Sequence, residues 1–224
     1  MTTQIQIAID GPAAAGKSTI AKIVAGRLGY VYIDTGAMYR AITLKALNKG
    51  IDLSSNEKIG ALLESTDIDL QPSDSGQLVF LDGDNVTEAI RSQAVTAAVS
   101  EISAHESVRM QMAELQQRLA EGRGVVMDGR DIGTHVLPAA QLKVFMSASV
   151  EERARRRFAE NGLRGIETPL VELQAEIAAR DKMDSERKVA PLKQAEDAIY
   201  LDTTELSIEQ AADEILALAE ERLS

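Results

Sequence analysis

The sequence predicts an α/β fold with a parallel, doubly wound sheet, and two observations support this prediction. Short apolar segments typical of strands alternate with longer segments whose apolar residues recur at helical spacing. A glycine-rich loop follows the first of these strands and opens the first helix. The 224 residues suffice for one such domain with small additions.

The expected elements can be placed in chain order from their hydrophobic spacing and their end signals. Ser207 is a suitable cap for a helix that runs to residue 223. Gly50 and Gly122 are expected to end two earlier helices. The predicted strands are 4–10, 30–34, 124–127, 142–146 and 198–201, and the predicted helices include 17–28, 36–48, 100–121 and 207–223.

The middle of the chain differs from this pattern and predicts a small antiparallel insert with a helix on either side. Its β-like segments are short and cover residues 68–70, 78–81 and 85–86. Residues 72–76 and 82–84 are rich in Asp, Gly, Ser and Pro, which favour turns.

The composition excludes several classes of protein. The chain has no cysteine, which excludes a disulfide scaffold and a thiolate metal site. Its first residues lack the features of a signal peptide and no apolar segment approaches the ~18 residues of a membrane span, so we expect a soluble, cytoplasmic protein. A net charge of −11 disfavours nucleic acid as a partner. Arginine outnumbers lysine 15 to 9, which favours a small anionic ligand.

The glycine-rich loop predicts a site for ATP. Residues 11–18 match G-x-x-x-x-G-K-[ST], for which roughly 0.005 matches are expected by chance in a shuffled chain. Glycine lets successive N–H groups face phosphate oxygens, and the helix start adds its positive dipole end. Lys17 would reach the β- and γ-phosphates, and the Ser18 hydroxyl would bind Mg²⁺. The predicted ATP-binding residues are Gly11, Pro12, Ala13, Ala14, Ala15, Gly16, Lys17, Ser18 and Thr19.

Two further charged segments fit phosphoryl transfer. The apolar strand that reaches Asp128 ends in a carboxylate, which in such enzymes holds Mg²⁺ directly or through a water molecule. Four arginines lie within residues 153–157, and the glycine-containing segment 161–165, which includes Arg164, follows them. Neighbouring arginines repel one another when no anion is present. This pattern therefore favours a lid that closes on a triphosphate, rather than a solvated helix face.

The remaining charged residues leave structural and functional interpretations open. Arg180, Asp184 and Arg187 have the spacing of one helix face, which suits a surface ion-pair ladder as well as a ligand site. A phosphate acceptor needs no protein base, because a phosphate monoester is largely dianionic at pH 7. A structural role is favoured for residues that stand alone, namely Arg40, Arg91, Arg109, His105 and His135.

Longer strings resemble those of the bacterial cytidylate kinase family over essentially the whole chain. DTGAMYR and DGRDIGT, in this order after the glycine-rich loop, are highly specific. The matching segments are IAIDGPAAAGKST at 7–19, YIDTGAMYRA at 32–41, IRSQAV at 90–95, DGRDIGT at 128–134, ERARRR at 152–157 and RDKMDSERKVAPL at 180–192.

This resemblance implies a P-loop nucleoside monophosphate kinase fold: a five-stranded parallel sheet flanked by helices, a small antiparallel insert and an arginine-rich lid. It implies transfer of the γ-phosphoryl of ATP to CMP or dCMP with Mg²⁺, by a monomer that binds neither nucleic acid nor membrane. The implied division is a core of 1–36, 103–150 and 168–224, a monophosphate-binding domain of 37–102, and a lid of 151–167.

The resemblance also assigns roles to residues that match the family motifs. Asp131 would accept a hydrogen bond from the exocyclic amine of cytosine, which uracil lacks, and an unpaired buried acceptor costs about 1–3 kcal/mol. Thr35 and Asp184, with Arg180 beside them, would hold the sugar, Arg40 and Arg130 the acceptor phosphate, and Ser100, Arg109 and Asp131 the base. The implied catalytic residues are Lys17, Arg130, Arg153, Arg157 and Arg187, and the implied metal ligands are Ser18 and Asp128.

Three other functions are weighed against this one. A P-loop kinase for another small acceptor, such as shikimate or gluconate, would lack the antiparallel insert and DGRDIGT. A nucleotide sensor would need a guanine-reading motif such as N-K-x-D, which the sequence lacks. A nucleic-acid-dependent ATPase is disfavoured by the negative charge.

Overall fold

The centre of the molecule is a five-stranded parallel sheet with the order β2-β6-β1-β7-β8. A computed structural model describes residues 4–73, 76–163 and 165–223. β1 lies between β6 and β7 and not beside β2, which follows it in the chain, so the chain crosses over in both directions from β1, as in doubly wound folds. The strands are β1 (Gln6–Asp10), β2 (Val31–Asp34), β6 (Val125–Gly129), β7 (Leu142–Ser147) and β8 (Ile199–Asp202).

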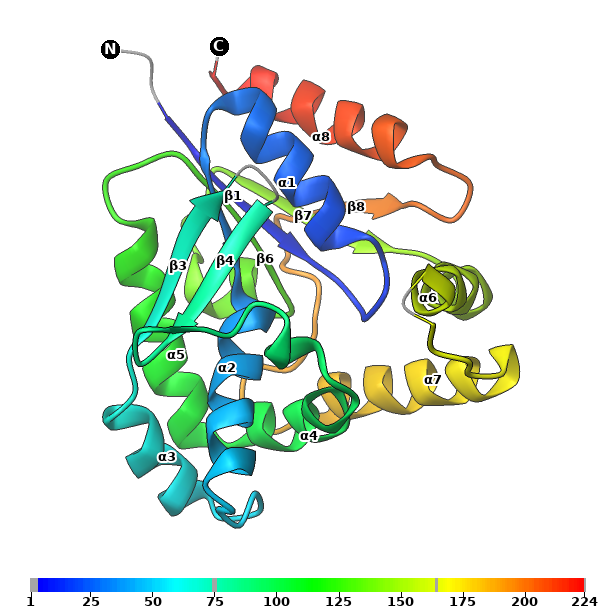
Figure 1. Cartoon of the computed structure of the whole chain (residues 1–224). Coiled ribbons are helices and arrows are strands. Elements are labelled where there is room, and N and C mark those ends of the chain that lie inside the picture. Colours follow the sequence, from blue (N-terminus) through cyan, green and yellow to red (C-terminus); the bar gives the residue numbers. More distant parts are fainter. Residues whose placement is uncertain (1–3, 74–75, 164, 224) are drawn as a thin grey trace.

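Helices cover both faces of this sheet (Figure 1). On one face, α1 (Lys17–Leu28) and α8 (Ile208–Leu223) pack over an aliphatic core that includes Ile7, Val144 and Ile215. On the other face lie α2 (Thr35–Asn48) and α5 (Glu106–Ala120), which share a second core with β6. The parallel sheet confirms the predicted fold class, and the catalytic edge of such a sheet is the one at its carboxyl ends.

The predicted antiparallel insert is a separate three-stranded sheet, β3-β4-β5. It comprises β3 (Ile68–Ser73), β4 (Gly76–Leu81) and β5 (Asp84–Asn85), and the helix α3 (Asn56–Glu64) precedes it. Residues 74 and 75 of the expected turn lie outside the described residues. Gln77 of β4 bonds to the backbone of β2, so the hairpin is fixed to the edge of the main sheet.

Two helices extend from the carboxyl edge of the sheet (Figure 1). They are α6 (Val150–Leu163) and α7 (Leu170–Glu186), and they share a small core of Ala154, Leu173 and Ile177. Arg164, in the expected lid, lies outside the described residues. No helix among the described residues is long and apolar enough to cross a membrane.

The single helix expected over 100–121 is wrong, because two helices meet at His105. The first is α4 (Gln93–Ala104), after the short turn η1 (Ala89–Arg91), and the second is α5. His105 has an extended backbone (ψ 130°), and its Nε2 lies 2.6 Å from the Leu53 carbonyl oxygen. A tertiary contact therefore ends the helix at a position where the sequence has neither Gly nor Pro as a stop signal.

Replacing Gly11 by alanine destabilises the protein by about 3 kcal/mol or more. Gly11 has φ +151°, and an added Cβ would lie 1.9 Å from the Met146 carbonyl oxygen. Urea unfolding measures the effect. Gly26→Ala is the control, because its Cβ would meet no described atom within 4 Å outside its chain neighbours and its own helix backbone. Alanine also favours the helix by up to about 1 kcal/mol. Equal stabilities of the two variants would contradict the close approach of Gly11 to β7.

Candidate active site

The P-loop joins β1 to α1 in the form that the sequence predicts. Gly16 has φ +87° and caps α1, and Ala14 has φ +60°. The Lys17 ammonium is buried and donates to the Pro12 carbonyl oxygen at 2.7 Å. Burial, with Arg130 close by, lowers the pKa of Lys17 to about 7. The phosphates of a bound nucleotide would favour the charged lysine, so the loop is suited to a polyanion.

The two predicted metal ligands meet at the carboxyl end of β6. The Ser18 hydroxyl donates to one oxygen of Asp128 at 2.8 Å, and the Tyr32 hydroxyl donates to the other at 2.8 Å. Burial and the nearby Asp34 raise the pKa of Asp128 to about 6. Burial likewise raises the pKa of Tyr32 well above its ordinary value, so its hydroxyl stays a donor.

This donor set fits Mg²⁺. Carboxylate and hydroxyl oxygens are the ligands that Mg²⁺ prefers, and a raised carboxylate pKa indicates that a cation is favourable there. The described residues contain no group of three or more His, Cys, Asp or Glu that could hold a metal. The protein thus offers one or two ligands, which suits an ion that arrives with substrate phosphates.

Asp10 was missed by the sequence analysis, although it precedes the P-loop directly. Its carboxylate accepts from the N–H groups of Ile132 at 2.8 Å and Gly133 at 2.7 Å. These two residues begin the π-helical turn Ile132–Val136, which follows Asp131. Asp10 therefore ties the ATP-binding loop to the segment that carries the predicted acceptor residues. The residues around Asp10 in the sequence do not indicate this contact, because its partners lie more than a hundred residues away.

Asp10 makes the stability of the protein depend on pH in a defined direction. Burial raises its pKa to about 6, although the Gly133 and Ile132 N–H groups oppose the shift. The native protein therefore takes up a proton below pH 6 that the unfolded chain does not, so the group's contribution to stability is lost as the pH rises through 6.

We expect the free energy of unfolding of the wild type, relative to Asp10→Asn, to rise by about 1 kcal/mol from pH 7 to pH 5. Urea unfolding of both proteins at the two pH values measures this difference. A difference that stays constant, or falls toward pH 5, would contradict the buried, charged state of Asp10.

A cluster of arginines from four elements lies beside the P-loop lysine. Burial and Arg130 lower the pKa of Arg180 to about 9, and burial and Arg157 lower the pKa of Arg40 to about 10. At pH 7 Arg40 and Arg180 therefore remain charged, and Arg130 and Arg157 repel them. The Nε of Arg180 is buried without a hydrogen-bond partner among the described residues. Such a cluster is stabilised by a bound dianion, as a phosphate monoester would be.

A second cluster surrounds Asp131. The Arg109 guanidinium lies 2.5 Å from one carboxylate oxygen, and the Arg187 guanidinium lies 3.5 Å from the other. Asp184 is 3.9 Å from Arg187 and 2.9 Å from the Nε of Arg130, so it links the two clusters. Burial opposes ionisation of Asp184, but Arg130 and Arg180 outweigh it and lower its pKa.

The predicted helix face of Arg180, Asp184 and Arg187 is only partly correct. α7 ends at Glu186, and Arg187 follows it with an extended backbone (ψ 145°). Its Nε donates to the Ala190 carbonyl oxygen at 2.7 Å, which turns the side chain toward Asp131. The structure thus places Arg187 among the residues expected to hold the base and sugar. A contact with the transferring phosphoryl stays a prediction.

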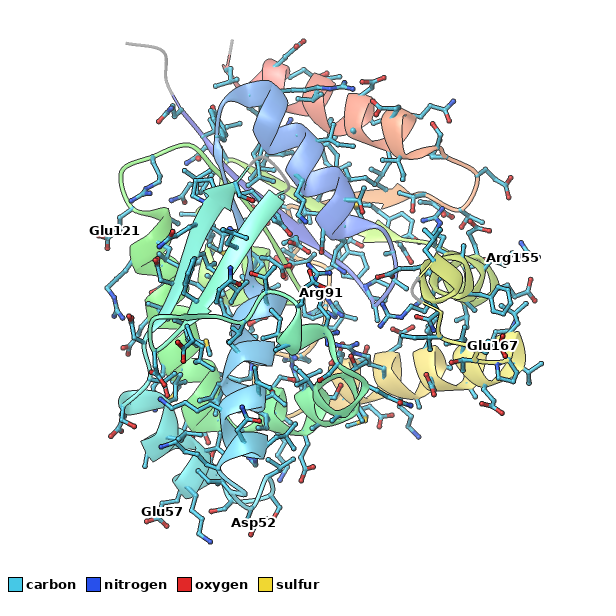
Figure 2. The ribbon with its side chains drawn as sticks, in the orientation of Figure 1. Asp52, Glu57, Arg91, Glu121, Arg155 and Glu167 are labelled. Carbon is cyan, nitrogen blue, oxygen red and sulfur yellow. The ribbon has the colours of Figure 1, made fainter. Side chains whose placement is uncertain are left out.

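The arginines of α6 are divided between the P-loop and the cluster. Arg153 is buried and bonds to the Ala13 carbonyl oxygen at 3.0 Å and to Asp181 at 2.6 Å, so it holds the loop against α7. The charge of Arg157 acts on Arg40 and Arg180. Arg155 points away to solvent (Figure 2). Arg156, to which the sequence analysis gave no role, lies 3.4 Å from the Ala15 carbonyl oxygen.

The remaining predicted residues are Thr35, Ser100 and Thr19. The Thr35 hydroxyl is buried and donates to the Asp128 carbonyl oxygen at 2.7 Å, which leaves its lone pairs available. Ser100 is half-buried on α4, the helix before the one that carries Arg109. Thr19 is exposed in the first turn of α1. The assignments of Thr35, Ser100 and Thr19 remain predictions.

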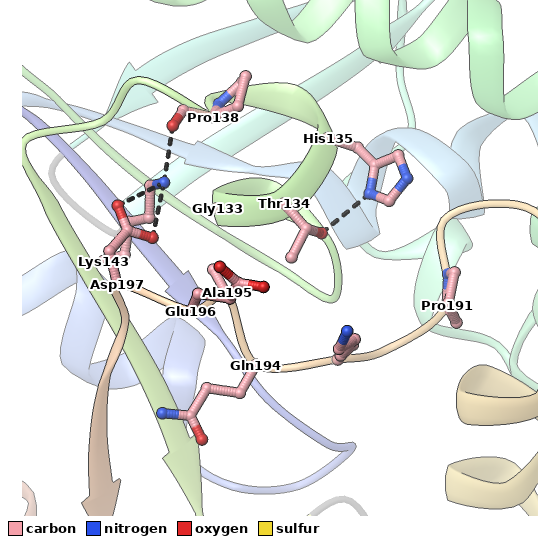
Figure 3. A pocket seen from close by; sticks show the side chains of 11 residues that line it. Gly133, Thr134, His135, Pro138, Lys143, Pro191, Gln194, Ala195, Glu196 and Asp197 are labelled. Atoms are coloured by element: carbon pink, nitrogen blue, oxygen red, sulfur yellow. Dashed lines mark hydrogen bonds and ion pairs between the residues drawn. The ribbon is translucent and has the colours of Figure 1, made fainter.

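A cavity of about 380 Å³ lies on the far side of the segment after Asp131 (Figure 3). Thr134 and His135 line one wall, and Lys143, paired with Asp197 at 2.8 Å, lines another. It contains none of the predicted site residues. Its lining contains two lysines and two acidic residues, so its charge does not favour an anion.

The parallel sheet, the P-loop and the arginine cluster at its carboxyl edge define a P-loop kinase. A family model described as cytidylate kinase matches residues 7–221. The chain is 62% identical to a cytidylate kinase of Lysinibacillus sphaericus over 223 residues, all of both chains. It is 56% identical to that of Bacillus subtilis over 222 residues, 99% of each chain. The chain therefore belongs to the cytidylate kinase family.

A solved structure supports the fold independently. An uncharacterized protein from Eubacterium ventriosum aligns with 98% of this chain and 99% of its own, with a TM-score of 0.53 and 10% identity. At that identity the likeness concerns the fold alone.

Proposed function

We propose that this chain transfers the γ-phosphoryl of ATP to CMP or dCMP, giving ADP and CDP or dCDP. The observation that carries the proposal is the set of charged arginines beside Lys17, next to a buried carboxylate that can pair with an exocyclic amine. The full-length match to the cytidylate kinase family agrees with both features.

ATP and its Mg²⁺ are assigned to the P-loop edge. Residues 11–19 hold the triphosphate, with Lys17 on the β- and γ-phosphates. Ser18 and Asp128 would hold Mg²⁺, which would spread the charge of the transferring phosphoryl. Arg153 and Arg156 keep the loop in place, because both bond to its carbonyl oxygens.

The acceptor is assigned to the two arginine clusters. Arg40 and Arg130 hold its phosphate, and Thr35 and Asp184, with Arg180 beside them, hold the sugar. Asp131 accepts from the cytosine amine, while Arg109 and Arg187 fix the carboxylate that does so. Ser100 completes the base site.

The reaction needs orientation and charge neutralisation rather than a base. The acceptor phosphate is already largely dianionic at pH 7 and attacks the γ-phosphorus in line with the leaving ADP oxygen. Lys17, Arg130 and Arg157 lie where two anionic groups would meet, so they lower the repulsion between them. Closure of the lid, residues 151–167, would exclude water as a competing acceptor.

The same assignment divides the chain into parts. We place the ATP-binding core in 1–36, 103–150 and 168–224, the monophosphate-binding part in 37–102 and the lid in 151–167. A single copy contains every assigned residue, so a monomer suffices. The net charge of −11 supports small-molecule substrates rather than nucleic acid.

The test is an ADP-release assay with Mg²⁺-ATP and each nucleoside monophosphate in turn. We expect rapid turnover with CMP and dCMP, slower turnover with UMP and negligible turnover with AMP or GMP. Failure of CMP and dCMP to give turnover, while ATP still binds, would refute the acceptor assignment and leave the P-loop assignment intact.

A further inference from the structure

The residue Tyr32 joins two parts of the molecule that have separate roles. It lies on β2, at one edge of the main sheet, and its hydroxyl donates to Asp128 on the adjacent strand at 2.8 Å. Its own carbonyl oxygen accepts from the Gln77 side chain at 2.6 Å. The side-chain amide oxygen of Gln77, Oε1, also accepts from the Asp34 N–H at 3.0 Å, so the hairpin holds β2 on both sides of Ile33.

Hydrogen bonds to a metal-binding carboxylate set its orientation and affinity. Among the described residues, the side chains that bond to the Asp128 carboxylate are those of Ser18 and Tyr32. Ser18 is itself an assigned metal ligand, because its hydroxyl oxygen can bind the ion through a lone pair while its O–H donates to Asp128. Tyr32 is therefore the side chain that holds the carboxylate without being a metal ligand.

We infer that Tyr32 is a positioning residue for Asp128, and that the β3–β4 hairpin holds Tyr32 in place through Gln77. Through Gln77 and Tyr32, the antiparallel insert thereby helps to position the carboxylate of the metal site. The inference rests on the proposed Mg²⁺ site and assigns it two residues that contact neither ion nor substrate.

The test uses Mn²⁺ as the probe, because free Mn²⁺ can be counted by electron paramagnetic resonance. Each protein, saturated with ADP, is titrated with Mn²⁺, and the affinity for ADP is measured separately without metal. Tyr32→Phe removes only the hydroxyl. Tyr30→Phe is its matched control. The Tyr30 hydroxyl accepts from the Ile5 N–H at 3.1 Å, at the amino end of β1 and away from the metal site.

We expect Tyr32→Phe to raise the Kd for Mn²⁺ about tenfold, with metal-free ADP binding unchanged. Gln77→Ala should raise it in the same direction, whereas Gln71→Ala should not, because Gln71 bonds only to Asp69 on its own strand in the described contacts. A Kd for Tyr32→Phe equal to that of Tyr30→Phe would overturn the inference. A normal Kd for Gln77→Ala would overturn the role of the hairpin.

Asp128→Asn separates this inference from the proposed metal site. We expect it to weaken Mn²⁺ binding more than Tyr32→Phe does. If Asp128→Asn leaves the Kd unchanged, the metal site itself is wrong. If Asp128→Asn weakens binding and Tyr32→Phe does not, only the positioning role of Tyr32 fails.

Discussion

Lys17→Met lowers kcat by about a thousandfold or more, while the protein stays folded. The Lys17 ammonium is buried at the start of α1, where burial and Arg130 already oppose its charge. A lysine placed where its surroundings oppose its charge is expected to act on the negative charge that develops between the two phosphates. Steady-state ADP release with CMP measures the loss.

Lys182→Met is the control for this substitution. Lys182 lies on α7 between Asp181 and Asp184, but its side chain is exposed. It should keep kcat near that of the wild type. If the kcat of Lys17→Met were within tenfold of the wild type, Lys17 would not stabilise the transition state.

Asp131→Asn lowers kcat/KM for CMP by about a hundredfold and removes most of the preference for CMP over UMP. The carboxylate is held between Arg109 and Arg187, and its substitution leaves two buried cations short of an anion. We therefore expect an additional loss of stability of about 3 kcal/mol. Activity with both nucleotides and urea unfolding measure the two effects separately.

Asp197→Asn is the matched control, because Asp197 pairs with a buried lysine outside the active site. It should leave the ratio of CMP to UMP activity unchanged. An unchanged ratio in Asp131→Asn itself would show that another group reads the base.

Local signals predicted most of the fold. The helix expected at 17–28 is α1 to the residue, and the Ser207 cap of α8 is present as a reciprocal pair with Gln210. These features depend on neighbours in the chain. The break at His105 depends on a contact with Leu53, fifty-two residues away, and no local pattern marks it.

The same distinction applies to the candidate site. The P-loop is one continuous segment, so its pattern sufficed, and the family match confirms the predicted family and the predicted use of ATP. The arginine cluster draws Arg40, Arg130, Arg157 and Arg180 from four segments, and only folding brings them together. Taken alone, the position of Arg40 in the sequence did not indicate a ligand. The resemblance to a family, rather than spacing, supplied its role.

The central claim is that a phosphate, and not a hydroxyl or water, accepts the γ-phosphoryl. Phosphorus NMR of a mixture of Mg²⁺-ATP, the enzyme and either CMP or cytidine tests this most directly. We expect the CMP mixture to show the paired resonances of CDP beside ADP, and the cytidine mixture to show no phosphorylated product. Inorganic phosphate as the main product with CMP, or phosphorylation of cytidine, would contradict the claim.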